Sequence, residues 1–131
     1  MVRQGDLIKV SFNPQQGHEQ AGYRPALVVS NDEFNMRTNM AIVCPVTNTD
    51  NGFPLHVPLD SRTETAGFVL CEHIRTLDLN ARHNVFVEKI PDDLLRRVTE
   101  IIRAEVELIR ISFIHDYQHF FADMMLKRQM A

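Results

Sequence analysis

The sequence predicts a mainly β protein, a small, curled antiparallel barrel followed by C-terminal helices. Short apolar segments rich in β-branched residues recur between residues 5 and 90, and polar turn residues separate them. At Pro91 the apolar pattern changes from a strand period to a helical one. Many short strands first and long helices last favour a barrel that a C-terminal helix closes.

Length and composition indicate one globular domain. The chain has 131 residues, of which 44% are hydrophobic and 24% charged, and its apolar runs are too short to span a bilayer. A net charge of −3 excludes a broad basic surface, so a nucleic acid would have to bind at a local site. Asp6 interrupts the N-terminal segment before a signal peptide could form, so we expect a cytoplasmic protein without membrane contact. Cys44 and Cys71 lie in apolar stretches and are expected to be buried, reduced thiols.

The first predicted strand covers residues 7–12, which alternate with a period of two. Ile8, Val10 and Phe12 are expected to face the core, and Leu7 to face outward. The polar connection that follows, residues 13–24, is long for a link between strands, and this length hints at a functional loop.

The central part of the chain predicts further short strands. Residues 25–31 and 40–46 indicate two buried strands, and residues 32–39 between them a single helical turn that starts at Asn31 or Asp32. Beyond a turn at 48–52, strands are expected at 53–59, 67–71 and 84–90, whereas 73–79 fits either a 3₁₀ turn or a strand.

Pro91 and the acidic pair after it predict the start of a long helix, because proline suits a first helical turn and carboxylates complement the helix dipole. Its apolar stripe comprises Leu94, Val98, Ile101, Ile102, Leu108 and Ile109. A second amphipathic helical segment is expected toward the C-terminus, with Phe113, Tyr117, Phe120, Phe121, Met124 and Met125 on its apolar side.

Several segments together resemble the MazF/PemK/Kid family of toxin endoribonucleases. They are GDLIKVSFNP near the N-terminus, the nonapeptide GHEQAGYRP, PALVVSNDEFN, CPVTN, GFVLCEHIRTLDLNAR and the helix that begins PDDLLRRV. The resemblance covers residues 5–111 and implies an SH3-like barrel that assembles as a homodimer. We therefore expect a toxin domain over 1–114 and an amphipathic C-terminal extension over 115–131.

The activity that this resemblance implies is sequence-specific cleavage of single-stranded mRNA, which inhibits translation. The ribose 2′-hydroxyl attacks its own phosphodiester and leaves a 2′,3′-cyclic phosphate and a 5′-hydroxyl. This reaction needs a base, an acid and donors to the developing charge, and it needs neither metal nor cofactor. The resemblance also implies a cognate antitoxin protein as a partner.

Five residues match catalytic positions of the family. Arg24 matches its active-site arginine, and the guanidinium fork can bridge two phosphate oxygens. Thr47 matches a threonine at a strand end, where its hydroxyl can donate to phosphate. His18 and Glu19 match loop positions implicated in catalysis or substrate contact, and Glu72 matches an acid that serves as the base in some members. Which of these is the base stays open.

One position departs from the family pattern. The Kid branch has an arginine two residues before the acid, and this chain has Leu70, so that arginine's role cannot be carried over and His18 gains weight as a proton-transfer group. The residues expected to bind RNA are Gln16, Gln20, Phe53, Arg75 and Arg82.

Two alternatives stand beside a nuclease. One is a non-catalytic barrel that only binds RNA or antitoxin, which the Leu70 position favours. The other is a gyrase-poisoning toxin of the CcdB type, which relies on a tryptophan near its C-terminus, whereas this chain has no tryptophan. His115 and His119 have the spacing of metal ligands on a helix, but we interpret them as solvated because nothing convincing completes a site.

Overall fold

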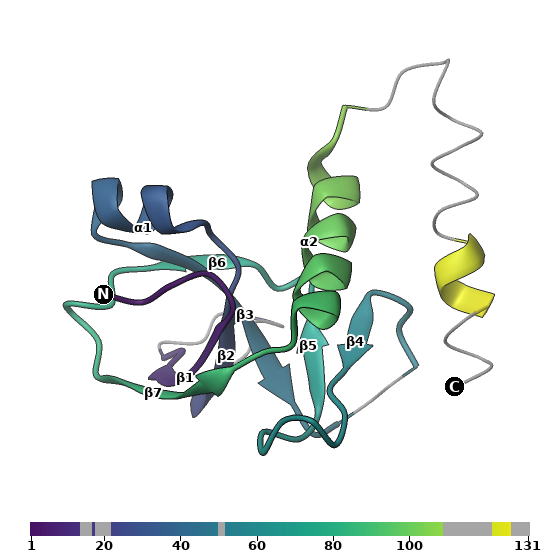
Figure 1. Cartoon of the computed structure of the whole chain (residues 1–131), viewed down its shortest axis with the longest axis horizontal. Coiled ribbons are helices and arrows are strands. Elements are labelled where there is room, and N and C mark those ends of the chain that lie inside the picture. Colours follow the sequence, from purple (N-terminus) through teal and green to yellow (C-terminus); the bar gives the residue numbers. More distant parts are fainter. Residues whose placement is uncertain (14–16, 18–21, 50–51, 109–121, 127–131) are drawn as a thin grey trace.

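The chain folds into a curled antiparallel sheet with its helices on the outside (Figure 1). The computed structural model describes residues 1–13, 17, 22–49, 52–108 and 122–126. The elements in chain order are β1 (Asp6–Ser11), β2 (Tyr23–Val28), α1 (Asp32–Thr38), β3 (Ala41–Thr47), β4 (His56–Pro58), β5 (Phe68–Leu70), β6 (Arg75–Leu77), β7 (Asn84–Lys89) and α2 (Asp92–Val106).

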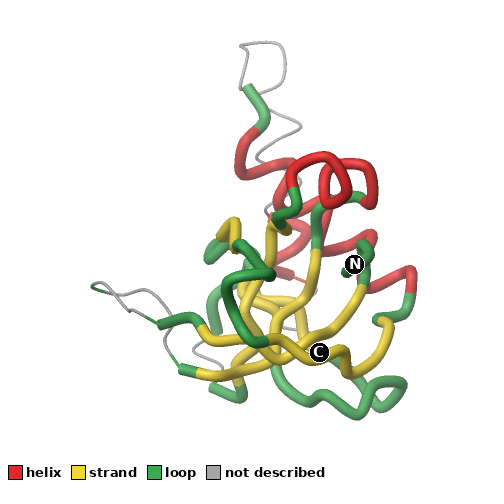
Figure 2. Tube along the Cα trace, turned by 90° about the vertical axis from the view of Figure 1, so that its left-hand side faces the viewer, coloured by secondary structure: helices red, strands yellow, loops and turns green. Residues whose placement is uncertain are grey.

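β3 is the centre of this sheet. It pairs with β2 along one edge, and along the other edge it pairs first with β6 and then with β5, so that the strand order is β4-β5-β3-β2-β1-β7 with β6 beside β3. The pairs among the described residues do not join β4 to β7, so the sheet curls without closing. Figure 2 shows the strands curling while the helices gather toward one end. The mainly β prediction is confirmed, and the ambiguous segment 73–79 contains a strand, β6.

The sheet has an apolar core on each of its faces. The inner cluster, inside the curl, comprises Ile8, Val10, Phe12, Ala26, Val28, Ala41, Val43 and Leu77. The outer cluster lies between the sheet and α2 and comprises Leu7, Leu27, Val29, Cys44, Val46, Val57, Val69, Cys71, Ile90, Val98, Ile101 and Met124. Both cysteines are free and buried, as expected.

The outer cluster corrects one prediction for β1. Ile8, Val10 and Phe12 are buried as predicted, but Leu7 is also fully buried. Leu7 belongs to the outer cluster with residues of α2, so the beginning of β1 is covered on both faces. The alternating pattern predicted an outward-facing Leu7 side chain, whereas residues of α2 pack against that face of β1.

α1 begins at the predicted cap. The Asn31 side chain accepts a hydrogen bond from the Phe34 backbone N–H at 2.8 Å, which satisfies one of the amides left open at a helix start. The helix has seven residues rather than a single turn, and it ends at Asn39, whose φ of 55° is left-handed. The buried Asn35 side chain is hydrogen-bonded to Ser30 and ties the helix to the end of β2.

α2 begins after Pro91 with two acids in its first turn, as predicted, but it ends earlier than its apolar stripe suggested. The last helical residue is Val106, Glu107 has extended backbone angles, and Leu108 is 70% exposed. Neither glycine nor proline marks this end, and the predicted stripe residue Ile109 lies outside the described residues.

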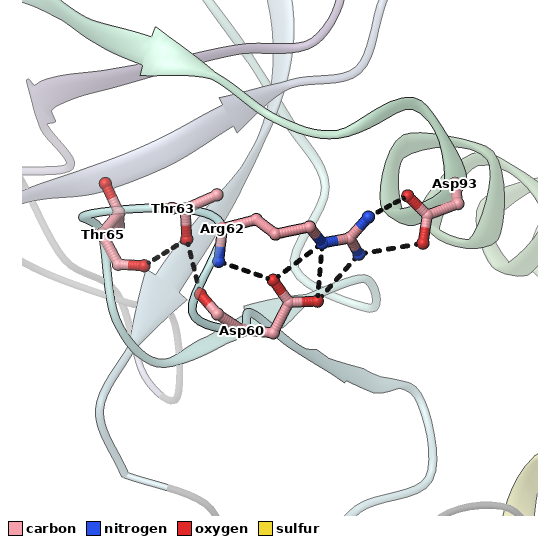
Figure 3. Close-up of polar contacts among 5 residues, drawn as sticks. All are labelled: Asp60, Arg62, Thr63, Thr65 and Asp93. Carbon is pink, nitrogen blue, oxygen red and sulfur yellow. Dashed lines mark hydrogen bonds and ion pairs between the residues drawn. The ribbon is translucent and has the colours of Figure 1, made fainter.

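The β4–β5 connection is tied to both α2 and β7. Arg62 pairs with Asp60 in its own loop and with Asp93 in the first turn of α2, each at 2.8 Å (Figure 3). On the other side, the Glu88 carboxylate of β7 accepts hydrogen bonds from the Glu64 and Thr65 backbone amides and from the Thr65 hydroxyl. These contacts hold the loop against the end of β5.

The C-terminal extension returns to the sheet. Residues 122–126 are helical, and Met124 is 5% exposed and belongs to the outer cluster (Figure 1). The prediction that Met124 packs against protein is therefore confirmed. The other side chains named for this packing, Tyr117, Phe120 and Phe121, lie outside the described residues.

Candidate functional site

The register of two adjoining strands relates the strand ends that carry Arg24 and Thr47. β2 and β3 are antiparallel, with Val28 opposite Val43 and Ala26 opposite Pro45. The ladder pairs end at Ala26 and Pro45, and the same register continued by two residues to the strand ends would bring Arg24 opposite Thr47. Directly opposed residues have Cβ atoms roughly 5 Å apart, so both side chains can reach one phosphate group. Both are half-buried, and they lie on the face of the inner cluster.

The backbones of Gly67 and Thr47 approach each other closely. A Cβ added at Gly67 would lie 2.4 Å from the Thr47 carbonyl oxygen, which is far inside van der Waals contact, and the φ of Gly67 is +118°. Only glycine fits this backbone conformation and this approach. The Thr47 hydroxyl accepts a hydrogen bond from the Thr49 backbone N–H at 3.2 Å, which leaves its own hydrogen available to donate.

Arg75 and Arg82 brace the end of β1. Nη1 of Arg75 donates to the Phe12 carbonyl at 2.9 Å, and Nη1 of Arg82 donates to the carbonyls of Ser11 at 2.9 Å and Asn13 at 2.7 Å. These bonds use one terminal nitrogen of each guanidinium. Both arginines therefore sit beside the β1–β2 connection, and their predicted contact with RNA stays a prediction.

The two ends of the β1–β2 connection are closed on each other. The Phe12 backbone N–H donates to the Gly22 carbonyl at 2.9 Å, and the Gly22 N–H donates to Oδ1 of Asn13 at 3.0 Å. Because Arg24 follows Gly22 by two residues, these bonds fix the position of its backbone at the beginning of β2. Four candidates within the connection lie outside the described residues, namely Gln16, His18, Glu19 and Gln20.

Glu72 is engaged with a histidine that sequence reasoning missed. Glu72 lies in the turn between β5 and β6, and its Oε2 is 2.7 Å from Nε2 of His56. His56 is 5% exposed and Glu72 25% exposed. A polar residue inside the apolar segment FPLHVPL was the only signal for His56. The ring of Phe53, a predicted RNA contact, meets the His56 ring edge-on at 5.4 Å, and Phe53 itself is exposed.

Two charged residues of α2 lie within electrostatic range of this part of the protein: Glu105 is influenced by Glu72, and Arg97, Glu105 and Glu72 all act on the Cys71 thiol. Burial, and then the charge of Glu72, raise the pKa of Glu105 to about 7. Within the described chain, Oε1 of Glu72, Nε of Arg97 and Oε1 of Glu105 are buried without a hydrogen-bond partner. We call His56, Glu72, Arg97 and Glu105 the buried charge cluster. Within this cluster, Oε2 of Glu72 contacts His56 and Oε1 of Glu72 is buried.

The neighbours of the buried charge cluster are apolar. Burial strongly raises the pKa of the Cys44 and Cys71 thiols, which keeps both protonated and unreactive. Leu70, where one branch of the resembling family has an arginine, is buried and pairs with His56 across β4 and β5. A guanidinium at this position would need a partner in an apolar setting.

The described ranges contain no cluster of three or more His, Cys, Asp or Glu side chains that could hold a metal ion. His115 and His119 lie outside those ranges. Among the helices that the structure describes, none is both long and apolar enough to cross a membrane.

Comparison with known proteins identifies the fold. A crystal structure of MazF (Form-I) from Deinococcus radiodurans superimposes with a TM-score of 0.77 at 36% identity, covering 82% of this chain and 97% of that one. A MazE-MazF structure (Form-II) from the same organism gives a TM-score of 0.71 at 35% identity, with the same coverage. The Endoribonuclease PemK of Escherichia coli is 37% identical over 103 residues, 74% of this chain and 76% of its own length.

The class that this fold and the family match define is the toxin component of a type II toxin–antitoxin system. Residues 3–106 match the PemK-like, MazF-like toxin family, and the chain belongs to this family.

Proposed function

We propose that this protein is an endoribonuclease toxin that cleaves single-stranded RNA and is neutralised by a cognate antitoxin. The observation that supports the proposal is the antiparallel register of β2 and β3, which brings the strand ends that carry Arg24 and Thr47 to one end of the sheet, in a chain whose relatives are named endoribonucleases. The MazE-MazF structure of a relative supports an antitoxin as the partner. Cleavage of mRNA would inhibit translation, which places the protein's action in the cytoplasm.

The proposed reaction is an attack of the ribose 2′-oxygen on the adjacent phosphorus. A P–O bond to the 2′-oxygen forms as the P–O5′ bond breaks, which gives a 2′,3′-cyclic phosphate and a 5′-hydroxyl. Arg24 holds two phosphate oxygens, and Thr47 donates its hydroxyl hydrogen to the same group, so both stabilise the charge of the phosphorane. Protein side chains supply every step, with no metal or cofactor in the scheme.

In this proposal, residues of the β1–β2 connection transfer the protons. A base takes the 2′-hydroxyl proton and an acid protonates the leaving 5′-oxygen, and both need hydrogen-bond reach. Oε2 of Glu72 is held by His56 and Oε1 is buried, which supports His18 and Glu19 in these roles instead. Glu72→Gln should then lower the melting temperature, while the folded variant cleaves RNA at close to the wild-type rate.

A homodimer is part of the proposal, as the family resemblance implies. A two-fold assembly covers the same surface of both subunits and adds stability to a barrel of this size. Light scattering at micromolar concentration should give the mass of a dimer.

The decisive experiment uses purified protein and a defined single-stranded RNA. Cleavage should continue in excess EDTA, the products should carry 5′-hydroxyl ends, and deoxyribose at the cut should abolish the reaction. Arg24→Ala should lower the rate by about 10²-fold or more, because a donor to developing charge is lost. Arg37→Ala is the matched control, since Arg37 is an exposed arginine on α1 that pairs with Glu33 of the same helix. Loss of cleavage on chelation, or 5′-phosphate products, would refute the mechanism.

A further inference from the structure

A pocket opens beside β7, at one edge of the curled sheet. It lies between the N-terminal residues, the end of α1 and the β6–β7 connection (residues 78–83), which Figure 1 shows around the same side of the molecule. Its volume is about 540 Å³, within the range of about 300–1,000 Å³ that small-ligand sites occupy. Leu79, one of its lining residues, also packs against the inner cluster. The pocket therefore borders the core without being filled by it.

One lining residue of the pocket is an aromatic ring that the core does not cover. Phe86 lies opposite Ile8 in the register of β7 and β1, so both side chains lie on the inner face of the sheet. Ile8 is fully buried, whereas Phe86, on the edge strand, is 60% exposed. Core packing does not account for this ring, and its face is available to a ligand in the pocket.

The polar part of the lining consists of asparagine amides. Nδ2 of Asn84 donates to the carbonyls of Leu79 at 2.8 Å and Arg82 at 3.0 Å, which uses both amide hydrogens and fixes the orientation of the group. No donor among the described residues bonds to its remaining atom, Oδ1. The exposed side chains of Asn39 and Asn80 likewise make no hydrogen bond within the described chain. The pocket thus offers one oriented acceptor and two adaptable amides.

The charges at the pocket do not favour a phosphate. Its one ionisable lining side chain among the described residues is Asp6, whose carboxylate accepts from Nζ of Lys89 at 3.0 Å and from the Arg3 backbone N–H at 2.9 Å. No lysine or arginine side chain belongs to the described lining. A nucleobase suits such a lining, because it has a flat face for stacking and an edge of donors and acceptors that asparagine amides can pair with.

We propose that this pocket binds a nucleobase, stacked on Phe86 and hydrogen-bonded at its edge to Oδ1 of Asn84. The two residues lie two positions apart on one face of β7, which places them about 7 Å from each other, and an exocyclic amine or ring N–H of the base donates to Oδ1. Val10 of β1 pairs with Arg24 on one side and with Asn84 on the other, so the pocket lies two strands from the candidate site. The base belongs either to a free nucleoside or to a single strand, since both present the same chemistry.

Two probes test the site and distinguish these sources. The first is the set of four free nucleosides, and the second is a set of short single-stranded oligodeoxynucleotides, which lack the 2′-hydroxyl that the proposed cleavage needs. At least one probe should shift the side-chain amide NMR signal of Asn84 and give a measurable Kd. Binding of nucleosides indicates a free ligand, and a shift by oligonucleotides alone indicates a base within a strand.

The variants test the stacking and the edge contacts. Phe86→Ala should raise the Kd of the bound probe about tenfold or more, because one base–aromatic stack is lost, and Phe86→Tyr should keep it close to the wild-type value. Val85→Ala is the matched control, since Val85 is a 46% exposed apolar neighbour on the other face of β7. Asn80→Ala should weaken binding without changing the melting temperature, because its exposed side chain bonds to no described residue.

The inference is overturned if neither probe shifts the Asn84 signal, or if Phe86→Ala leaves the Kd unchanged. It is also overturned if Phe86→Ala weakens the binding of an antitoxin alone, since the occupant would then be a protein. None of these measurements depends on cleavage of RNA. The proposed nuclease can therefore fail while the pocket stands, and the pocket can fail while the nuclease stands.

Discussion

At the scale of a single residue, the ionisation of Glu105 makes the stability of the protein depend on pH. Its pKa is raised from about 4.5 to about 7 by burial and by the neighbouring Glu72. Below about pH 4.5 the carboxyl is protonated in both folded and unfolded chains. Between about 4.5 and 7 the unfolded chain releases the proton while the folded chain keeps it, so the free energy of unfolding falls as the pH rises through this window.

Glu105→Gln should therefore stabilise the protein at pH 8 and leave it nearly unchanged at pH 5. The amide mimics the protonated acid and removes the cost of a buried second carboxylate beside Glu72. Thermal unfolding measured from pH 5 to 8 checks this, with the neighbouring exposed Glu107→Gln as the control. A Glu105→Gln variant whose melting temperature follows the wild type across the whole range would contradict it.

For single residues, the sequence predicted the features that depend on neighbouring positions in the chain. Arg24 and Thr47 stand at strand ends beside turn residues, and their pairing follows once the strands align. The contact between His56 and Glu72 joins residues 16 positions apart, and Glu105 reaches them from α2, far along the chain. Such contacts depend on how α2 packs across the sheet, which periodicity does not specify.

The element on which the candidate site depends most is the β1–β2 connection. Its ends are closed by the bonds between Phe12, Asn13 and Gly22, and Arg82 and Arg75 hold the adjoining carbonyls from β6 and the β6–β7 turn. Side chains expected from sequence to bind RNA therefore also shape the element that delivers Arg24. Their charge was evident from sequence, whereas their carbonyl partners depend on the curl of the sheet.

Arg82→Ala should loosen this closure and speed hydrogen exchange at the Phe12 and Gly22 amides. The half-buried Ser11 carbonyl and the exposed Asn13 carbonyl lose their donor, while the strand pairs of β3 with β2 are untouched. Arg82→Lys should restore the exchange rates only in part, since a single ammonium does not reproduce the planar fork. Exchange rates equal to those of the wild type would show that the backbone bonds suffice without Arg82.

At the scale of the whole molecule, the C-terminal extension adds to the outer core. Met124 enters the cluster that α2 and the sheet already share, although the family match ends at residue 106. The amphipathic pattern of residues 113–125 predicted packing against protein, which Met124 confirms among the described residues. It could not show where, because the docking surface is made of residues spread over most of the chain.

Deletion of residues 115–131 should lower the melting temperature and leave RNA cleavage per folded protein largely intact. A milder variant, Met124→Ala, should cost about 2 kcal/mol or more of unfolding free energy, as expected for a buried methionine. Thermal unfolding of both variants measures the contribution of packing, and light scattering measures assembly. The exposed Met125→Ala is the control. A truncated protein that is equally stable, or that loses only cleavage, would rule out the packing role.

The close approach of Gly67 to the Thr47 carbonyl has a consequence for genetics. In a selection for cells that survive expression of a toxin, inactivating mutations usually point to the residues that do the chemistry. Here any side chain at Gly67 would force the Thr47 backbone away from its place opposite Arg24. Survivors should therefore include substitutions at a residue that has no side chain, and a map of escape mutations would mark Gly67 as if it were part of the active site.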